Sequence, residues 1–181
     1  DIGLHLDSSE LDPFYEKLSA LDVPLFIHPA PAGIDGPKGD NNLTQYDLDI
    51  LTGFAAQETL AIATLIYGGV LERHPNVDIC FSHAGGAIPM LMGRLNEAGM
   101  RRPWVSESLR KDGAFETYLS RLWFDNHVHD PRVLDFVIDM LGTDRLVLGT
   151  NFAGWDQHSV EGSDGWMLLL ADNARRLLRV E

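Results

Sequence analysis

Short apolar segments alternate with helical segments along this chain, and this alternation most strongly limits the folds that the chain can adopt. Nearly continuous apolar segments are typical of strands that are buried on both faces of a sheet. Five strands are predicted, over residues 2–6, 24–29, 77–83, 122–125 and 145–149. Such strands separated by amphipathic helices indicate a parallel sheet and an α/β fold. Since no repeat or flexible linker is visible, residues 1–181 are expected to form a single domain.

The number of predicted βα units leaves two architectures open. A complete (β/α)₈ barrel takes roughly 250 residues, whereas this chain has 181 residues and about five units. We therefore expect either an open α/β sheet or an incomplete TIM-type barrel that lacks its first strands. The first residue is Asp1 and not Met, so a processed, trimmed or incompletely represented polypeptide is expected. An incomplete barrel exposes sheet edges, which predicts a homodimer or contact with a missing N-terminal part.

Signals for helix ends fall between the predicted strands. Asp130 is a suitable N-cap, and Gly142 is a suitable stop, for the best-specified helix of the chain. Asp12 begins a helix in the same way, and the segment 30–44, rich in Gly, Pro, Asp and Asn, is expected to be a functional loop. Further helices are predicted over 46–73, after residue 87 and over 166–178.

The composition excludes several classes of partner. There are 27 acidic and 14 basic residues, which gives a formal net charge of −13. Nucleic acid is excluded because phosphate binding requires clustered cations. No uninterrupted apolar run reaches the roughly 20 residues of a membrane span. The only cysteine, Cys80, is expected in the core of a strand. It excludes an internal disulfide, and together with the lack of a visible signal peptide it favours the cytoplasm.

Two histidines stand at the ends of predicted strands, His28 in FIHP and His83 in FSHAGG. The carboxyl ends of parallel strands meet at one edge, so both imidazoles are expected to face the same site. Neutral imidazole binds Zn²⁺ and similar ions, and a second histidine beside the metal could move a proton. Asn151 follows the last strand at the corresponding position, where a carboxylate would complete a metal site. The simpler alternative is a structural role for each histidine.

Four segments together resemble the second half of the amidohydrolase-2 family. They are FIHP at 26–29, GGVLERHPNVDICFSHAGGAIPMLMGR at 68–94, LWFDNHVHDPRVLDFVIDMLGTDRLVLGTNFAGWD at 122–156 and DNARRLL at 172–178. The resemblance extends from roughly Leu11 to the C-terminus. The family includes aminocarboxymuconate semialdehyde decarboxylase and hydroxybenzoate decarboxylases. It therefore implies a metal-dependent (β/α)₈ barrel that acts on small, usually aromatic or unsaturated carboxylic acids.

The resemblance also implies roles for particular residues. His28 matches a metal ligand, and His83 matches the histidine that activates metal-bound water or moves a proton. Arg94 matches an arginine that in some members reaches a substrate carboxylate across a dimer interface. The family's first-strand ligand pair is absent, since the sequence LHL around His5 lies in the wrong place, and the final-strand carboxylate is replaced by Asn151. With one well-matched ligand against the usual three, the chain is expected to bind divalent metal weakly.

Other residues near the predicted strand ends are weaker candidates. Asp156 and His158 could substitute for the missing carboxylate, and His127 and His129 could line the same site. Trp155 could stack on a planar substrate. Each of them also has a simpler interpretation as an ordinary loop residue.

Three functions fit these observations. The first is a metal-dependent lyase that decarboxylates a small aromatic or unsaturated acid, with His83 handling the proton and Arg94 and Trp155 binding the substrate. Zinc is the expected ion, and manganese or another divalent ion is the alternative. The second is a hydrolase that directs a metal-bound hydroxide at an amide, ester or lactone. The third is a catalytically silent binding or structural partner. Release of carbon dioxide separates the first function from the second.

Overall fold

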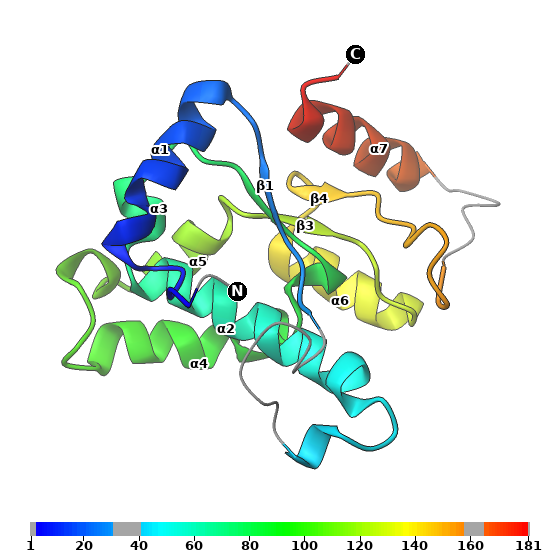
Figure 1. Ribbon diagram of the computed structural model, residues 1–181, viewed down its shortest axis with the longest axis horizontal. Helices are drawn as coiled ribbons and strands as arrows, with labels where there is room; N and C mark the ends of the chain where they lie inside the picture. The colour runs from blue at the N-terminus through cyan, green and yellow to red at the C-terminus, as the bar shows by residue number, and fades with distance from the viewer. Residues whose placement is uncertain (1–2, 31–40, 158–164, 181) are drawn as a thin grey trace.

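Four parallel strands form one sheet in the computed structural model, which describes residues 3–30, 41–157 and 165–180 (Figure 1). The strands are β1 (Leu25–Ile27), β2 (Ile79–Phe81), β3 (Trp123–Asp125) and β4 (Leu146–Val147). They lie side by side in chain order, with Phe26 opposite Cys80 and Phe124 opposite Leu146. Each pair is parallel, which confirms the predicted α/β class.

The prediction of a strand over 2–6 is wrong for its described part, residues 3–6. The carbonyl oxygen of His5 accepts a hydrogen bond of 3.0 Å from the amide of Ser8, which closes a turn. The next carbonyl, that of Leu6, accepts a bond of 2.8 Å from the hydroxyl of Tyr15. Because these carbonyls are engaged locally and by a helix, the segment does not pair with β1. The described residues therefore contain four strands and not five.

Helices connect the strands and cover the sheet. They are α1 (Asp12–Leu21), α2 (Phe54–Tyr67), α3 (Val70–Arg73), α4 (Ile88–Arg101), α5 (Ala114–Leu119), α6 (Pro131–Leu141) and α7 (Gly165–Leu178). The predicted cap of α6 is confirmed, since the Asp130 carboxylate accepts a bond of 2.9 Å from the amide of Arg132. Gly142 follows the last residue of this helix, as predicted.

The helix predicted over 46–73 is divided into three parts. A π-helical turn, Asp49–Gly53, leads into α2, and α2 is separated from α3 by Gly68 and Gly69. Gly69 has φ +72°, a left-handed conformation that interrupts a helix. A Cβ atom on Gly68 would lie 2.2 Å from the Cβ of Asp7, so the chain passes this point only without a side chain.

The helical stretch Asp49–Tyr67 is the one segment of the described chain that is long and apolar enough to cross a membrane, with 19 residues and a mean hydropathy of 1.3. In this fold it packs on the sheet through Ile62 and Leu65, which are fully buried. Its Glu58 carboxylate is bonded to residues that follow β2. Length and composition alone are weak evidence of a membrane span, and 28% of the apolar window in this stretch is buried inside the fold.

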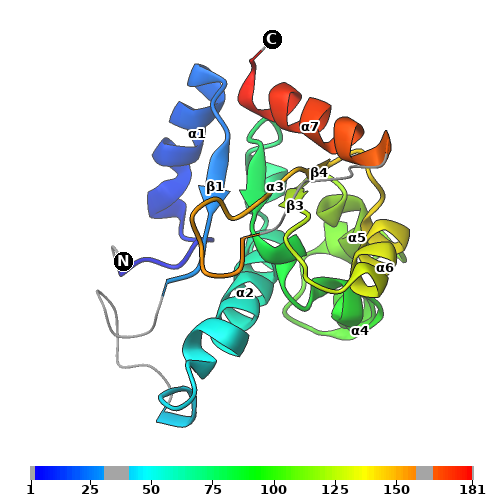
Figure 2. The ribbon, with the colours of Figure 1, turned by 90° about the vertical axis from the view of Figure 1, so that its right-hand side faces the viewer.

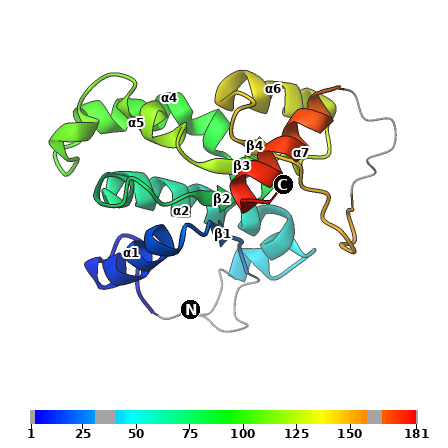
Figure 3. The same cartoon turned by 90° about the horizontal axis from the view of Figure 1, so that it is seen from above.

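The core lies on both faces of the sheet, because alternate strand residues point in opposite directions. Phe81 and Phe124 belong to the larger cluster, on the side of α2 and α4. Cys80 and Trp123 face the other side, where Leu177 of α7 packs against them. Figures 1, 2 and 3 show α7 across the sheet from α2 and α4. The predicted core position of Cys80 is confirmed, and burial raises the pKa of its thiol.

Coverage of the second face is incomplete. Phe26 pairs with Cys80 across β1 and β2 and therefore shares its face, yet 55% of Phe26 is exposed. Burying a phenylalanine side chain contributes about 2 kcal/mol. The exposed end of this face, beside β1, is thus a surface that the described residues leave uncovered.

Candidate functional site

A row of histidines lies along the edge of the sheet where the strands end. His28 follows β1, His83 follows β2, and His127 follows β3. The ring centroids are 5.6 Å apart for His28 and His83, 5.5 Å for His83 and His127, and 5.0 Å for His127 and His129. The prediction that His28 and His83 lie at the same end of the sheet is confirmed. The parallel order of the strands sets the order of the row.

The backbone next to His28 determines which of its ring nitrogens is available. Its Nδ1 lies 2.6 Å from the carbonyl oxygen of Pro29, which can only accept, so Nδ1 carries the proton. The lone pair of the neutral ring is then on Nε2. Phe54 packs against the ring edge-on, with the two ring centroids 5.7 Å apart. This tautomer is the one in which Nε2 can bind a metal ion or accept a proton.

His83 is paired with a buried carboxylate. Its Nδ1 donates a hydrogen bond of 3.0 Å to Oε1 of Glu58, a residue of α2 that is 1% exposed. The same oxygen accepts a bond from the Ser82 hydroxyl. The hydrogen bond to Glu58 raises the pKa of His83, burial opposes this shift, and the negative charges of Glu58 and Asp125 add to it. The pair therefore favours a protonated imidazole at the site.

Tight backbone geometry presents His83 at the end of β2. His83 has φ +46°, and Gly86, three residues later, has φ +65°. A Cβ atom on Gly86 would lie 2.2 Å from the carbonyl oxygen of Ala55 in α2, so only glycine fits. The glycines of the FSHAGG segment thus allow α2 to approach closely enough for Glu58 to reach His83.

Asp125 joins two of the turns that carry the histidines. It is the last residue of β3, and its Oδ1 accepts bonds from the amide of Ala84 at 3.3 Å and from the amide of His127 at 3.0 Å. Burial raises the pKa of Asp125, although these hydrogen bonds and the nearby histidines act in the opposite direction. Asp125 and Glu58 are site residues that the sequence analysis did not single out. The sequence held a signal for each of them: Asp125 ends an apolar strand, and Glu58 is the one acidic residue of the apolar helix α2.

A second group of donors surrounds Asp156. Its Oδ2 lies 3.0 Å from Nε2 of His129 and 3.7 Å from Nε2 of His127. Its other oxygen, Oδ1, accepts a hydrogen bond from the Asn151 side chain. Burial raises the pKa of Asp156, but the bonds from His129 and Asn151 outweigh this, and the pKa is lowered overall. His158, the other proposed substitute for a strand-end carboxylate, lies outside the described residues.

The structure places the two predicted substrate-binding residues on exposed surface. Arg94 lies on α4, six residues and therefore about 9 Å along the helix axis from Ile88. Trp155 lies in the loop after β4 and is 77% exposed. Within the described part of the chain, neither side chain makes a bond or ring contact with His28 or His83. Asn151 is also exposed, and it contacts Asp156 and not a strand-end histidine.

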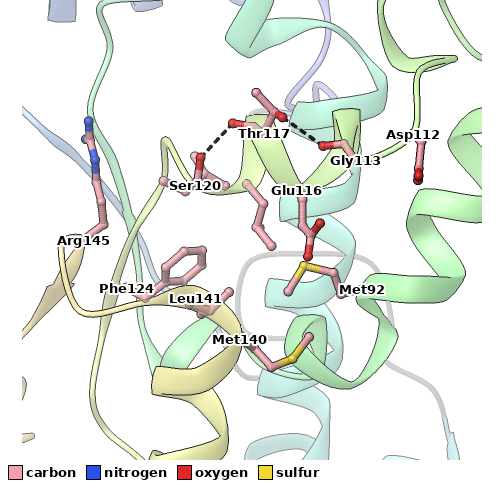
Figure 4. Close-up of a pocket in the computed structure, with 12 residues that line it drawn as sticks. Met92, Asp112, Gly113, Glu116, Thr117, Ser120, Phe124, Met140, Leu141 and Arg145 are labelled. Atoms are coloured by element: carbon pink, nitrogen blue, oxygen red, sulfur yellow. Dashed lines mark hydrogen bonds between the residues drawn. The ribbon is translucent and has the colours of Figure 1, made fainter.

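A separate hollow of about 470 Å³ lies between α4, α5 and α6 (Figure 4). Met92, Met140 and Leu141 form its apolar part, and Glu116 points into it. Its lining also includes Arg145, which precedes β4 and thus marks the opposite edge of the sheet from the histidines. The hollow is therefore not part of the histidine site.

Comparison with known proteins adds a family and a fold. The sequence model described as amidohydrolase (Amidohydro_2) matches residues 2–180. The chain is 34% identical over 150 residues to 2-amino-3-carboxymuconate-6-semialdehyde decarboxylase of Dictyostelium discoideum. That match covers 83% of this chain and 40% of the relative. The chain thus spans less than half the length of this relative.

Two solved structures show the fold. The structure of 5-carboxyvanillate decarboxylase from Sphingomonas paucimobilis matches with a TM-score of 0.82 at 19% identity, over 98% of this chain and 56% of the other. The 5-carboxyvanillate decarboxylase from Novosphingobium aromaticivorans, crystallised with manganese, matches with a TM-score of 0.78 at 22% identity, over 98% and 54%. The four-stranded sheet accordingly matches part of a TIM-type barrel, the second of the two architectures expected from the sequence.

Proposed function

Since the chain belongs to the amidohydrolase family whose model matches residues 2–180, we propose that it contributes the part of a metal-dependent decarboxylase active site that contains His28 and His83. The substrate class is a small aromatic or unsaturated carboxylic acid, by analogy with 2-amino-3-carboxymuconate-6-semialdehyde decarboxylase and 5-carboxyvanillate decarboxylase. The observation that carries this proposal is the pairing of His83 with the buried Glu58 beside the free ring nitrogen of His28.

A divalent cation fits this edge of the sheet only in part. His28 offers Nε2 as a ligand because Pro29 holds the proton on Nδ1. A catalytic zinc site has three protein ligands, and the other expected ligands are not among residues 3–30, 41–157 and 165–180 at this position. Such a cation would polarise the substrate's oxygens. Manganese is bound in several structural neighbours, and zinc or manganese is proposed here.

His83 would provide the proton that replaces the lost carboxylate. The protonated ring donates Nδ1–H to Glu58 and can direct Nε2–H at the substrate carbon. As the carbon–carbon bond breaks, carbon dioxide leaves and the bonding electrons stay on that carbon, which takes the proton from Nε2. His83 is then neutral and regains a proton from water. Glu58 stabilises the charged form before the step, which makes it a positioning residue.

Arg94 and Trp155 would act on the substrate from outside this edge. Arg94 is exposed on α4, which suits contact with a substrate carboxylate across a subunit interface. Trp155 is exposed in a loop beside the histidines and would cover a planar substrate. We propose a homodimer, or association with an N-terminal part, because the described residues leave Phe26 exposed at the β1 end of its sheet face. The buried thiol of Cys80 suits a cytoplasmic location, which is likewise a proposal.

Carbon dioxide release tests the proposed activity. The protein is loaded with Mn²⁺ or Zn²⁺ and incubated with hydroxybenzoic acids and unsaturated dicarboxylic acids. We expect release of carbon dioxide that His83→Asn strongly reduces. His5→Asn, at an exposed position outside the site, should leave the release unchanged. Hydrolysis of an amide, ester or lactone without carbon dioxide would favour the hydrolase. Neither reaction, with the fold intact, would favour a binding or structural role.

A further inference from the structure

The cluster of His127, His129 and Asp156 is not used by the proposed reaction. It lies at the ends of β3 and β4, one histidine further along the row from His83. The three side chains each offer a ligand atom, and these atoms all lie within 4.8 Å of one another. His28 is not part of this group. The cluster therefore needs its own explanation.

The distances suit a cation held between the three groups. Metal bonds of about 2.0–2.2 Å, as in zinc sites, place neighbouring ligand atoms about 2.9–3.5 Å apart. Oδ2 of Asp156 lies 3.0 Å from Nε2 of His129 and 3.7 Å from Nε2 of His127. Both imidazoles thus present Nε2 to the same carboxylate oxygen. All three ligand atoms lie within 4.8 Å of one another, and the His129–Asp156 pair is already at ligand spacing.

The surroundings hold two of the ligands in place. His127 is 5% exposed, and its amide donates to the buried end of β3 at Asp125. The Asn151 amide donates to Oδ1 of Asp156, which leaves Oδ2 directed at the two histidines. A bond of 2.8 Å from the amide of Gly154 to the carbonyl of Asn151 closes the loop that carries Asp156. Such outer contacts are what orient the ligands of known metal sites.

We propose that His127, His129 and Asp156 form a binding site for a divalent transition-metal ion such as Zn²⁺ or Co²⁺. Two imidazole nitrogens and one carboxylate oxygen favour these ions over Mg²⁺ and Ca²⁺, which prefer sites made of oxygen ligands. Binding displaces the protons shared between the rings and the carboxylate. His129 is 57% exposed, so water can reach the ion and complete its coordination. The site does not depend on the proposed decarboxylase activity.

Metal titration in the His28→Ala background tests this site, since binding at His28 then makes no contribution. Zn²⁺ is titrated by calorimetry, and Co²⁺ by the visible absorption that tetrahedral cobalt gives. We expect one equivalent to bind. His129→Ala and Asp156→Asn should each weaken binding by more than about 100-fold, and Asn151→Ala by about 10- to 100-fold. Since His129 is exposed, its replacement leaves the core unchanged.

His5→Ala in the same background is the matched control, because His5 is an exposed histidine outside the cluster. It should bind Zn²⁺ as tightly as the background variant. The proposal is overturned if His129→Ala and Asp156→Asn bind Zn²⁺ unchanged, or if His28→Ala alone removes all binding. A failed carbon dioxide assay with Zn²⁺ still bound by this cluster would reject the decarboxylase and not the metal site.

Discussion

The two ends of the histidine row differ in where their carboxylates come from. At the β1–β2 end, Glu58 reaches His83 from a buried helix and bonds to Nδ1. At the β3–β4 end, Asp156 comes from a loop and faces Nε2 of His127 and His129. A carboxylate bonded to Nδ1 leaves Nε2 available to transfer a proton. A carboxylate close to two Nε2 atoms instead forms a set of metal ligands with them. Histidines in one row thus suit different chemistry, depending on whether a carboxylate contacts Nδ1 or Nε2 of the ring.

The largest effect is expected at His83. His83→Asn should lower the rate of carbon dioxide release by about 10²- to 10⁴-fold, because the proton donor is lost. Zn²⁺ binding at the β3–β4 end should not change. Steady-state rates and calorimetry on the same protein measure the two properties. Equal losses of both would show that the two ends act as one site.

Glu58→Gln tests the carboxylate that bonds to Nδ1 of His83. Glutamine keeps the shape and one oxygen acceptor but removes the charge that stabilises protonated His83. The loss of a hydrogen bond between charged groups, about 1.5–3 kcal/mol, predicts a decrease in kcat of about 10- to 100-fold with little change in KM. A larger KM with unchanged kcat would place Glu58 in substrate binding.

Asn151→Asp adds a negative charge at the β3–β4 end of the histidine row, next to Asp156. The substitution adds a negative oxygen but removes the amide donor that holds Oδ1 of Asp156, so a residue 151 that coordinates the ion should tighten Zn²⁺ binding by about tenfold, whereas one that only orients Asp156 should weaken it. Without metal, the two carboxylates repel, so the free chain should become less stable. Titration of both forms measures the change. Unchanged affinity would mean that residue 151 does not bind the ion directly.

The smallest effect is expected at the opposite edge of the sheet, where Asp78 precedes β2. It accepts bonds from Trp123 at 2.7 Å, Arg145 at 3.0 Å and Arg179 at 2.7 Å. Burial raises the pKa of Asp78, but these bonds outweigh it and lower the pKa overall. A lowered pKa stabilises the fold above the unfolded value of 3.8, and this contribution is lost as the pH falls through the folded value.

Asp78→Asn should therefore cost about 1 kcal/mol at pH 7, and the difference from the unmodified chain should disappear in acid. Urea unfolding at several pH values measures this. Metal binding and carbon dioxide release should not change, since Asp78 is at the other edge. Impaired catalysis at unchanged stability would contradict the separation of the two edges.

The fold was largely predictable because its signals are local. Asp130 and Gly142 mark the ends of α6 through contacts within a few residues. The strand over 2–6 was predicted wrongly for its described residues, 3–6, because the bond from Tyr15 to Leu6, nine residues apart, engages that segment. The close approach of Asp7, which lies far away in the sequence, similarly requires glycine at position 68, where the long helix is divided.

The sequence by itself determined that His28 and His83 share one edge, since parallel strands of this type end together. Only the tertiary structure decided which carboxylate each histidine meets. Glu58 lies 25 residues from His83, and Asp156 lies 27 residues from His129. Whether such groups meet depends on the rotation of α2 and on the path of the loop after β4. These are set by packing against the whole sheet, which no local pattern of residues records.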